Sequence, residues 1–336
     1  MNALNKLFLF VVLPALIAIA AAIGAVYYWV NHPLTLPSPK VDLLVPKGAT
    51  PASIASQINQ AGIELNSAAF VLMAKLTELD TKLKAGGYQL VTGDSPLKIL
   101  RRMAQGDVTS RQITLVEGWN MRQIRAALAQ HGDLKKTLED LSDADLVKQI
   151  GLQHQHPEGL FFPDTYIFPI GTTDLDILER AARAQQQILE RAWASRQENL
   201  PLTSPYQALI LGSIVEKETG KASDRARIAG VFINRLRLNM PLQTDPTVIY
   251  GMGEAYQGKI RKKDLQTDHA WNTYTRGGLP VSPISSVGQA SLNAALNPEK
   301  HDYLYFVAKG DGTSAFARTL PEHNKNVAQY ILGRKP

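Results

Sequence analysis

Two glutamates, Glu216 and Glu218, are the residues of this sequence best suited to acid–base chemistry. They end the segment YQALILGSIVEKET, which spans 206–219 and has the composition of a helix. Successive residues on a helix are rotated by about 100°, so Glu218 falls within about 20° of Leu211 and beside Val215, whereas Glu216 falls about 140° away. The pattern predicts that Glu218 faces the apolar core and that Glu216 faces away from it.

A carboxyl group at the end of an apolar stripe loses contact with water, which raises its pKa and lets it hold a proton near neutral pH. Such a group can act as a general acid, as a glutamic acid in an apolar pocket does in hen-type lysozyme. The plainer alternative is a glutamate at a helix C-terminus that pairs with Lys217, Lys221 or Arg225. Helix geometry alone leaves both readings of Glu218 open.

Polar side chains follow Glu218 on segments typical of a carbohydrate-binding cleft. A helix is expected over 228–240, a polar loop bounded by prolines over 241–247, and a second polar loop over 272–280. Sugar hydroxyls need paired donors and acceptors, and sugar faces pack on aromatic rings. The candidate substrate contacts are Asn234, Gln243, Thr244, Asp245, Tyr250, Asn272 and Tyr274.

A repeated pattern precedes these segments. Gly48, Gly93 and Gly118 each follow apolar residues, and each is followed by a polar residue suited to begin a helix, then by an isoleucine six positions after the glycine. The pattern predicts three units of strand, glycine turn and short helix. Their helices are expected to begin at Thr50, Ser95 and Asn120 and to stop at Gly62, Gly106 and Gly132. Further helices are expected over 134–151 and 173–199, the second long and amphipathic.

The first thirty residues indicate a membrane segment. From Leu7 to Val30 no residue is charged, and a helix of that length covers about 36 Å, enough to cross a bilayer core of about 30 Å. Aromatic residues at 27–29 suit the membrane boundary, and Lys6 lies on the other side. We favour an uncleaved signal anchor over a cleaved signal peptide. The proline-containing residues 32–39 are expected to form an extended spacer.

Composition excludes several classes of protein. The 336 residues include no cysteine, which removes disulfides, thiolate metal sites and cysteine nucleophiles. The net charge of +6 suits an acidic polymer or a membrane surface, and no nucleic-acid-binding motif accompanies it. We expect no cofactor and no metal.

Other motifs are set aside. His154, His156 and Glu158 are expected on a surface loop rather than at a metal, and His301 and His323 are expected to be isolated, structural or exposed. Ser95 and Lys98 have the S-x-x-K spacing of penicillin-binding enzymes, but no K-T-G motif accompanies them.

The segments SIVEKET, VFINRLRLNMPLQTDPTVIYGMG, EGLFFPDTY, NTYTRGGLP and YLYFVAKGDGTSAF resemble the endolytic murein transglycosylases of the MltG or YceG-like family. The resemblance implies an α+β protein with an N-terminal transmembrane helix, a small LysM-like module and a larger catalytic domain whose active-site region is lysozyme-like. It places the catalytic acid at Glu218. Relatives often have a Pro/Gly-rich continuation after G-L-P, whereas residues 281–287 read VSPISSV here. We expect that segment at the rim of the cleft.

The resulting domain prediction is a cytoplasmic N-terminus over 1–6, a transmembrane anchor over 7–30, a linker over 31–42, a LysM-like module over 43–110 and a catalytic domain over 111–336. The resemblance implies cleavage of the MurNAc–GlcNAc bond of nascent peptidoglycan at the bacterial inner membrane, with 1,6-anhydro-MurNAc ends as products. The bulk of the chain would lie in the periplasm and serve cell-wall biogenesis and cell shape. Peptidoglycan synthases are plausible partners. The alternative is a non-catalytic, membrane-anchored peptidoglycan-binding scaffold.

Overall fold

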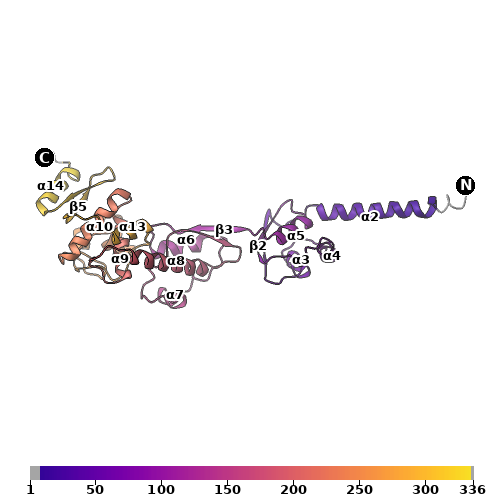
Figure 1. Ribbon diagram of the computed structural model, residues 1–336, viewed down its shortest axis with the longest axis horizontal. Helices are drawn as coiled ribbons and strands as arrows, with labels where there is room; N and C mark the ends of the chain where they lie inside the picture. Colours follow the sequence, from indigo (N-terminus) through magenta and orange to yellow (C-terminus); the bar gives the residue numbers. More distant parts are fainter. Residues whose placement is uncertain (1–7, 334–336) are drawn as a thin grey trace. The chain divides into compact units, whose positions relative to one another are not determined.

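A computed structural model describes residues 8–333 and divides the chain into two compact units of mixed helix and sheet (Figure 1). Unit 1 comprises the chain up to Gln112 together with 167–172, and unit 2 comprises 113–166 and the chain from Thr173 onward. Each unit has its own hydrophobic core. The expectations for Lys6 and Leu7 lie outside the described residues.

A long apolar helix begins unit 1. A short π-helical turn over Phe8–Val12 leads into α2, Leu13–Asn31. The stretch Phe10–Asn31 is 22 residues long, and its most apolar 18 residues have a mean hydropathy of 2.4 and include no buried residue. It is therefore long and apolar enough to span a membrane, and because it lies near the N-terminus, length and composition alone do not separate an anchor from a signal sequence.

Two of the predicted strand–turn–helix units form the rest of unit 1. The elements are β1 (Lys40–Val45), α3 (Pro51–Gln60), α4 (Ser67–Leu76), β2 (Gly86–Val91) and α5 (Pro96–Gln105). β1 and β2 pair antiparallel, with Leu43 opposite Tyr88. Gly48 and Gly93 have φ of +80° and +95°, a backbone conformation that favours glycine, and Ser95 accepts a hydrogen bond from the backbone of Lys98 as the N-cap of α5. The repeat prediction is confirmed here.

The proline-containing segment after α2 is not a free spacer. The amide of Leu34 donates to the carbonyl of Asp94 at 2.9 Å, and Leu34 and Leu36 pack against the core of unit 1. β1 already begins at Lys40, within the predicted linker. Apolar side chains at alternate positions between the prolines explain the difference, because they are buried against the unit instead of remaining in water.

Unit 2 begins with the third repeat. Gly118 has φ +76°, Asn120 caps α6 (Met121–Gln130), and this helix ends at His131 rather than at Gly132. α7 (Asp143–Ile150) covers only the second half of the helix expected over 134–151. β3 (Ser110–Thr114) pairs with β4 (Thr165–Pro169), and each of these strands belongs partly to unit 1 and partly to unit 2. α8 (Asp174–Ala194) is the predicted amphipathic helix.

The helix that carries the two glutamates is α9, Pro205–Glu218, with Ser204 as its N-cap. Every residue from Ala208 to Val215 is buried, because α8, α10, α11 and α13 surround it. Gly212 permits the close approach of α13: a Cβ at that position would lie 3.0 Å from Val287 and 3.4 Å from the backbone of Leu292. From Ala208 to Val215 α9 thus has no solvent face.

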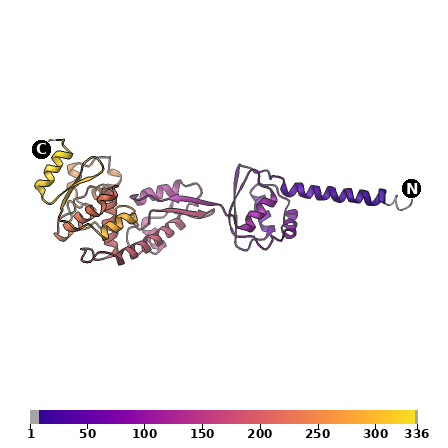
Figure 2. The same ribbon diagram turned by 45° about the horizontal axis from the view of Figure 1, so that its top comes forward.

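The remaining elements complete unit 2. They are α10 (Ala222–Arg237), α11 (Asp245–Met252), a 3₁₀ turn (Gly253–Ala255), α12 (Lys262–Gln266), α13 (Gln289–Leu296), β5 (Tyr305–Ala308), β6 (Ser314–Ala317) and α14 (Leu320–Tyr330). β5 and β6 form an antiparallel hairpin, and α14, shown in yellow in Figures 1 and 2, packs against it.

Candidate active site

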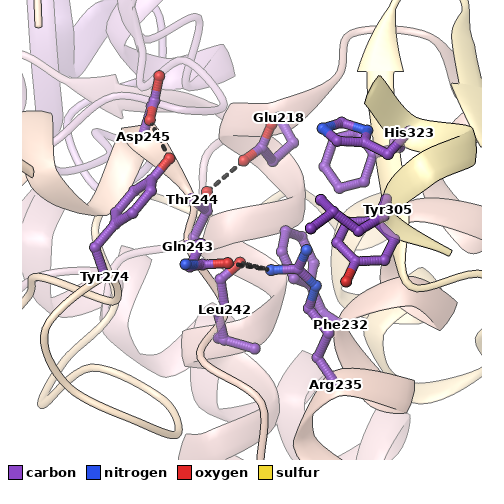
Figure 3. A pocket seen from close by; sticks show the side chains of 12 residues that line it. Glu218, Phe232, Arg235, Leu242, Gln243, Thr244, Asp245, Tyr274, Tyr305 and His323 are labelled. Carbon is purple, nitrogen blue, oxygen red and sulfur yellow. Dashed lines mark hydrogen bonds between the residues drawn. The ribbon is translucent and has the colours of Figure 1, made fainter. Parts of the chain in front are cut away.

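Glu218 is the last residue of α9 and its carboxyl group faces a pocket (Figure 3). The hydroxyl of Thr244 donates a hydrogen bond to Oε1 of Glu218. Burial raises the pKa of Glu218 to about 7, the hydrogen bond from Thr244 opposes this rise, and the charge of Asp245 adds to it. A carboxyl with that pKa is substantially protonated at neutral pH and can deliver its proton to a bound substrate.

The loop that carries Thr244 is held by buried polar contacts. Gln243 has φ +50°, an uncommon conformation for a residue with a side chain. The guanidinium of Arg235, on α10, donates to the carbonyl of Leu242 at 2.9 Å and to Oε1 of Gln243 at 3.3 Å. The amide of Thr244 donates to the hydroxyl of Thr273 at 3.1 Å. These contacts fix the hydroxyl of Thr244 against Glu218.

A second carboxyl lies beside the first. The polar loop ends sooner than expected, since Asp245 is the first residue of α11. Tyr274, from the second predicted loop, donates its hydroxyl to Oδ1 of Asp245 at 2.6 Å. Burial, then the hydrogen bond to Asp245, raises the pKa of Tyr274, so its hydroxyl stays protonated and keeps donating.

The pocket around these residues has a volume of about 370 Å³. Five of the predicted site residues come together in it: Glu218, Gln243, Thr244, Asp245 and Tyr274. The rest of the lining is aromatic, apolar or basic and is formed by Phe232, Arg235, Leu242, Tyr305, Phe306, Leu320 and His323. A protonated carboxyl among hydrogen-bonding groups and aromatic rings is suited to acid catalysis on a carbohydrate.

Comparison with known proteins agrees with this chemistry. Residues 43–329 match the model of the YceG-like family. This chain belongs to that family. An endolytic murein transglycosylase of Bacillus subtilis (strain 168) is 34% identical over 312 residues, which cover 88% of this chain and 86% of that protein.

Two further proteins are similar to this YceG-like chain. An endolytic murein transglycosylase of Streptococcus pneumoniae (serotype 2, strain D39) is 28% identical, and the match covers 85% of this chain but only 58% of that longer protein. The 2.6 Å crystal structure of a yceG-like protein from Listeria monocytogenes superposes with a TM-score of 0.55 at 34% identity, covering 85% of this chain and 98% of the other.

Three predicted contact residues of this YceG-like chain lie outside the Glu218 pocket. The amide of Asn234 donates to the carbonyls of His301 and Tyr303, at 2.7 and 3.1 Å. Asn272 is 1% exposed, and its amide donates to loop carbonyls while its oxygen accepts from the amide of Tyr274 at 2.8 Å. Tyr250 packs edge-on against Trp271, with ring centroids 5.4 Å apart.

The structure also adds residues that the sequence reasoning missed. His323 is not isolated: it lines the pocket, and its ring stacks on Tyr305 at 5.3 Å. Burial and then the charge of Arg235 lower the pKa of His323, which favours the neutral imidazole. No spacing in the sequence connects His323 to Glu218. Arg235 was also missed, although it is a charged residue within the otherwise largely apolar segment 228–240.

Glu158 is buried rather than on the expected surface loop. It is 3% exposed and accepts a hydrogen bond from the amide of Met121 at 3.0 Å. Burial raises the pKa of Glu158 to about 7, against hydrogen bonds from the backbone of Met121 and from Tyr250. The preceding histidines point elsewhere, His154 stacking on Tyr206 and His156 meeting the edge of Trp271. Within residues 8–333 no three side chains are grouped as a metal ion would require.

Two expectations about the surroundings of α9 were wrong. Glu216, expected to face away from the apolar core, turns instead toward α13, which packs on α9: its Oε2 accepts a hydrogen bond from the amide of Gly288 at 3.1 Å, at the start of α13. The segment VSPISSV does not form a rim, because residues 282–287 are all buried. Ser213 on α9 accepts from the amide of Ile284 at 3.0 Å. The wheel argument failed for Glu216 because α9 is buried on all sides from Ala208 to Val215, so the helix has no solvent face there to oppose the apolar stripe.

Proposed function

We propose that this YceG-like protein is an endolytic murein transglycosylase with Glu218 as its catalytic acid. The observation that carries the proposal is the carboxyl of Glu218, protonated near neutral pH by burial and held toward the pocket by Thr244. The relatives in Bacillus subtilis and Streptococcus pneumoniae that bear this name support the reaction class.

In the proposed reaction Glu218 donates its proton to the oxygen that joins C1 of MurNAc to GlcNAc, and the C1–O bond breaks. The carboxylate so formed accepts the proton of the 6-hydroxyl of the same MurNAc as its oxygen bonds to C1. The product is a 1,6-anhydro end, and no water is consumed. The hydroxyl of Thr244 stabilises the carboxylate between the two proton transfers. One carboxyl thus serves as acid and then as base.

The other groups of the pocket are assigned to substrate binding. Gln243, Asp245 and Tyr274 offer donors and acceptors to sugar hydroxyls, and Tyr305 with Phe306 offers aromatic faces. We do not extend this assignment to Asn234 and Asn272, because backbone carbonyls already occupy their amides.

The remaining parts of the prediction belong to the same proposal. Residues 7–30 anchor the chain in the bacterial inner membrane, with the bulk of the chain in the periplasm. Residues 43–110 form a LysM-like module that holds glycan, and residues 111–336 form the catalytic domain with a lysozyme-like active-site region. The repeated strand–turn–helix units and the apolar helix α2 support this arrangement. Peptidoglycan synthases that supply the nascent strands are the expected partners.

The test is a digest of purified peptidoglycan by the full chain in detergent, with products identified by mass spectrometry. We expect anhydro-MurNAc ends, and a loss of about 10²–10⁴-fold in rate for Glu218→Gln with normal folding. Glu216→Gln is the matched control, because an amide oxygen can still accept from Gly288. Reducing MurNAc ends would instead indicate a hydrolase with Asp245 as the second carboxylate. Binding without cleavage would indicate a scaffold.

A further inference from the structure

Helix α4 of unit 1 is apolar on two sides. Its inner side buries Phe70, Met73 and Ala74 in the core of the unit. On its outer side Leu72 is 57% exposed and Leu76 is 75% exposed. Two large leucines so exposed on one short helix cost free energy in water, so a neighbouring apolar phase is expected to cover them.

The outer side of α4 continues into the end of the apolar helix α2. Leu72 and Leu76 line a groove of about 240 Å³ together with Val26, Trp29 and Val30 of α2. Trp29 and Val30 also pack against the core of unit 1, so the end of α2 is an integral part of this unit. The groove and the last turns of the apolar helix therefore form one continuous apolar surface.

The depth of this surface follows from helix geometry. The apolar stretch ends at Asn31, and at a rise of about 1.5 Å per residue Val26 lies about 7–8 Å inside that end. Helices that lie in a membrane interface bury their apolar side about 5–10 Å into the boundary between headgroups and acyl chains. A helix that shares a groove with Val26 and Trp29 is at that depth whenever α2 spans the bilayer.

We propose that α4 lies in the membrane interface, with Leu72 and Leu76 in contact with lipid acyl chains beside the end of α2. The inference rests on the proposed membrane anchor. Exposed Lys75, between the two leucines in sequence, is placed to extend toward lipid phosphates. The short connection after α2 does not act as a flexible linker between α2 and the rest of unit 1, because Leu34 and Leu36 are packed on the same unit. Unit 1 is thus held against the membrane surface rather than suspended from it.

The experiment uses the full chain, which has no cysteine, so one introduced cysteine is a unique labelling site. Leu72→Cys and Leu76→Cys are labelled with an environment-sensitive fluorophore and reconstituted into phosphatidylethanolamine–phosphatidylglycerol vesicles that contain nitroxide-bearing lipids. Ile23→Cys, 65% exposed on α2, reports insertion of the anchor. Lys47→Cys, exposed in the turn after β1 and outside the groove, is the matched control.

We expect lipid nitroxides to quench the labels at 72 and 76 strongly, the label at 23 strongly and the label at 47 weakly. Labels at 72 and 76 that behave like the label at 47, while 23 is quenched, would overturn the proposal and leave the anchor intact. Absence of quenching at 23 would overturn the anchor itself. Quenching at 72 and 76 that is lost at high protein-to-lipid ratio would mean that a second copy covers the groove, and would also overturn the proposal.

Discussion

The contacts of Glu218 predict that two neighbouring substitutions move the pH dependence of activity in opposite directions. The free enzyme must hold Glu218 protonated, so activity should fall as pH rises through about 7, the pKa that burial confers. Thr244 lowers that pKa by donating to the carboxylate, and the charge of Asp245 raises it. Thr244→Val should therefore shift the falling limb to higher pH, and Asp245→Asn should shift it to lower pH.

The size of the Thr244 effect follows from the hydrogen bond that is lost. Hydrogen bonds to charged groups contribute about 1.5–3 kcal/mol, and about 1.36 kcal/mol corresponds to one pKa unit. Thr244→Val should thus raise the pKa read from the falling limb of the pH–activity profile by about one to two units, while it keeps the shape of the side chain. Asp245→Asn removes a charge but keeps an oxygen that can accept from Tyr274.

The assay is the initial rate of anhydro-product release from soluble glycan strands, at low substrate concentration, from pH 5 to pH 9. The position of the limb is compared rather than its height, because either substitution can also disturb substrate binding. Thr275→Val is the matched control, since its hydroxyl donates to Asp268 at 2.8 Å, outside the pocket. A limb that stays in place in Thr244→Val, or moves the same way in both variants, would refute the assignment of Glu218 as the titrating acid.

Three further predictions concern groups around the pocket. Glu158 has a folded pKa of about 7 against an ordinary value of 4.5, so the stability that its proton confers is complete below pH 4.5 and is lost as pH rises through 7. In urea unfolding, the free energy of unfolding of Glu158→Gln should therefore rise relative to that of the wild type by up to about 3 kcal/mol between pH 5 and pH 8. His323→Ala should lower activity about tenfold, because it removes from the pocket both a hydrogen-bonding group and the ring that stacks on Tyr305, whereas His154→Ala, which alters a histidine also stacked on a tyrosine but in another pocket, should not. Arg235→Lys should cost about 1–3 kcal/mol in thermal unfolding, because one ammonium cannot replace the guanidinium fork.

Local patterns were the part of this fold that the sequence predicted well. The glycine turns at Gly48, Gly93 and Gly118 and the caps at Thr50 and Asn120 were located correctly, since these signals depend on residues within a few positions. How deeply each segment is buried in the protein was less predictable. The segment after α2 was expected to be a spacer because of its prolines, yet the leucines between them decide where it packs.

The candidate site divides in the same way. Gln243, Thr244 and Asp245 follow one another, and their polar character marks them in any reading of the chain. No comparable local pattern identifies Glu158 or His323. Glu158 is buried where the amide of Met121, at the start of α6, donates to it, and His323 lies at the pocket because α14 packs on the β5–β6 hairpin. Contacts between segments far apart in sequence determine both positions, and no local pattern records them.

Glu218 was identified by an argument whose premise the structure corrects. From Ala208 to Val215 α9 is buried on all sides, so an apolar stripe does not distinguish Glu218 from Glu216. What distinguishes them is the partner at each carboxyl. Glu216 accepts a backbone amide from Gly288, whereas Glu218, at the end of the buried helix, has a threonine hydroxyl and a neighbouring carboxyl in an open pocket. A buried helix that ends at a pocket wall is therefore enough to place an acid where its proton is easily given to a ligand, and the residues around that end set how readily it leaves.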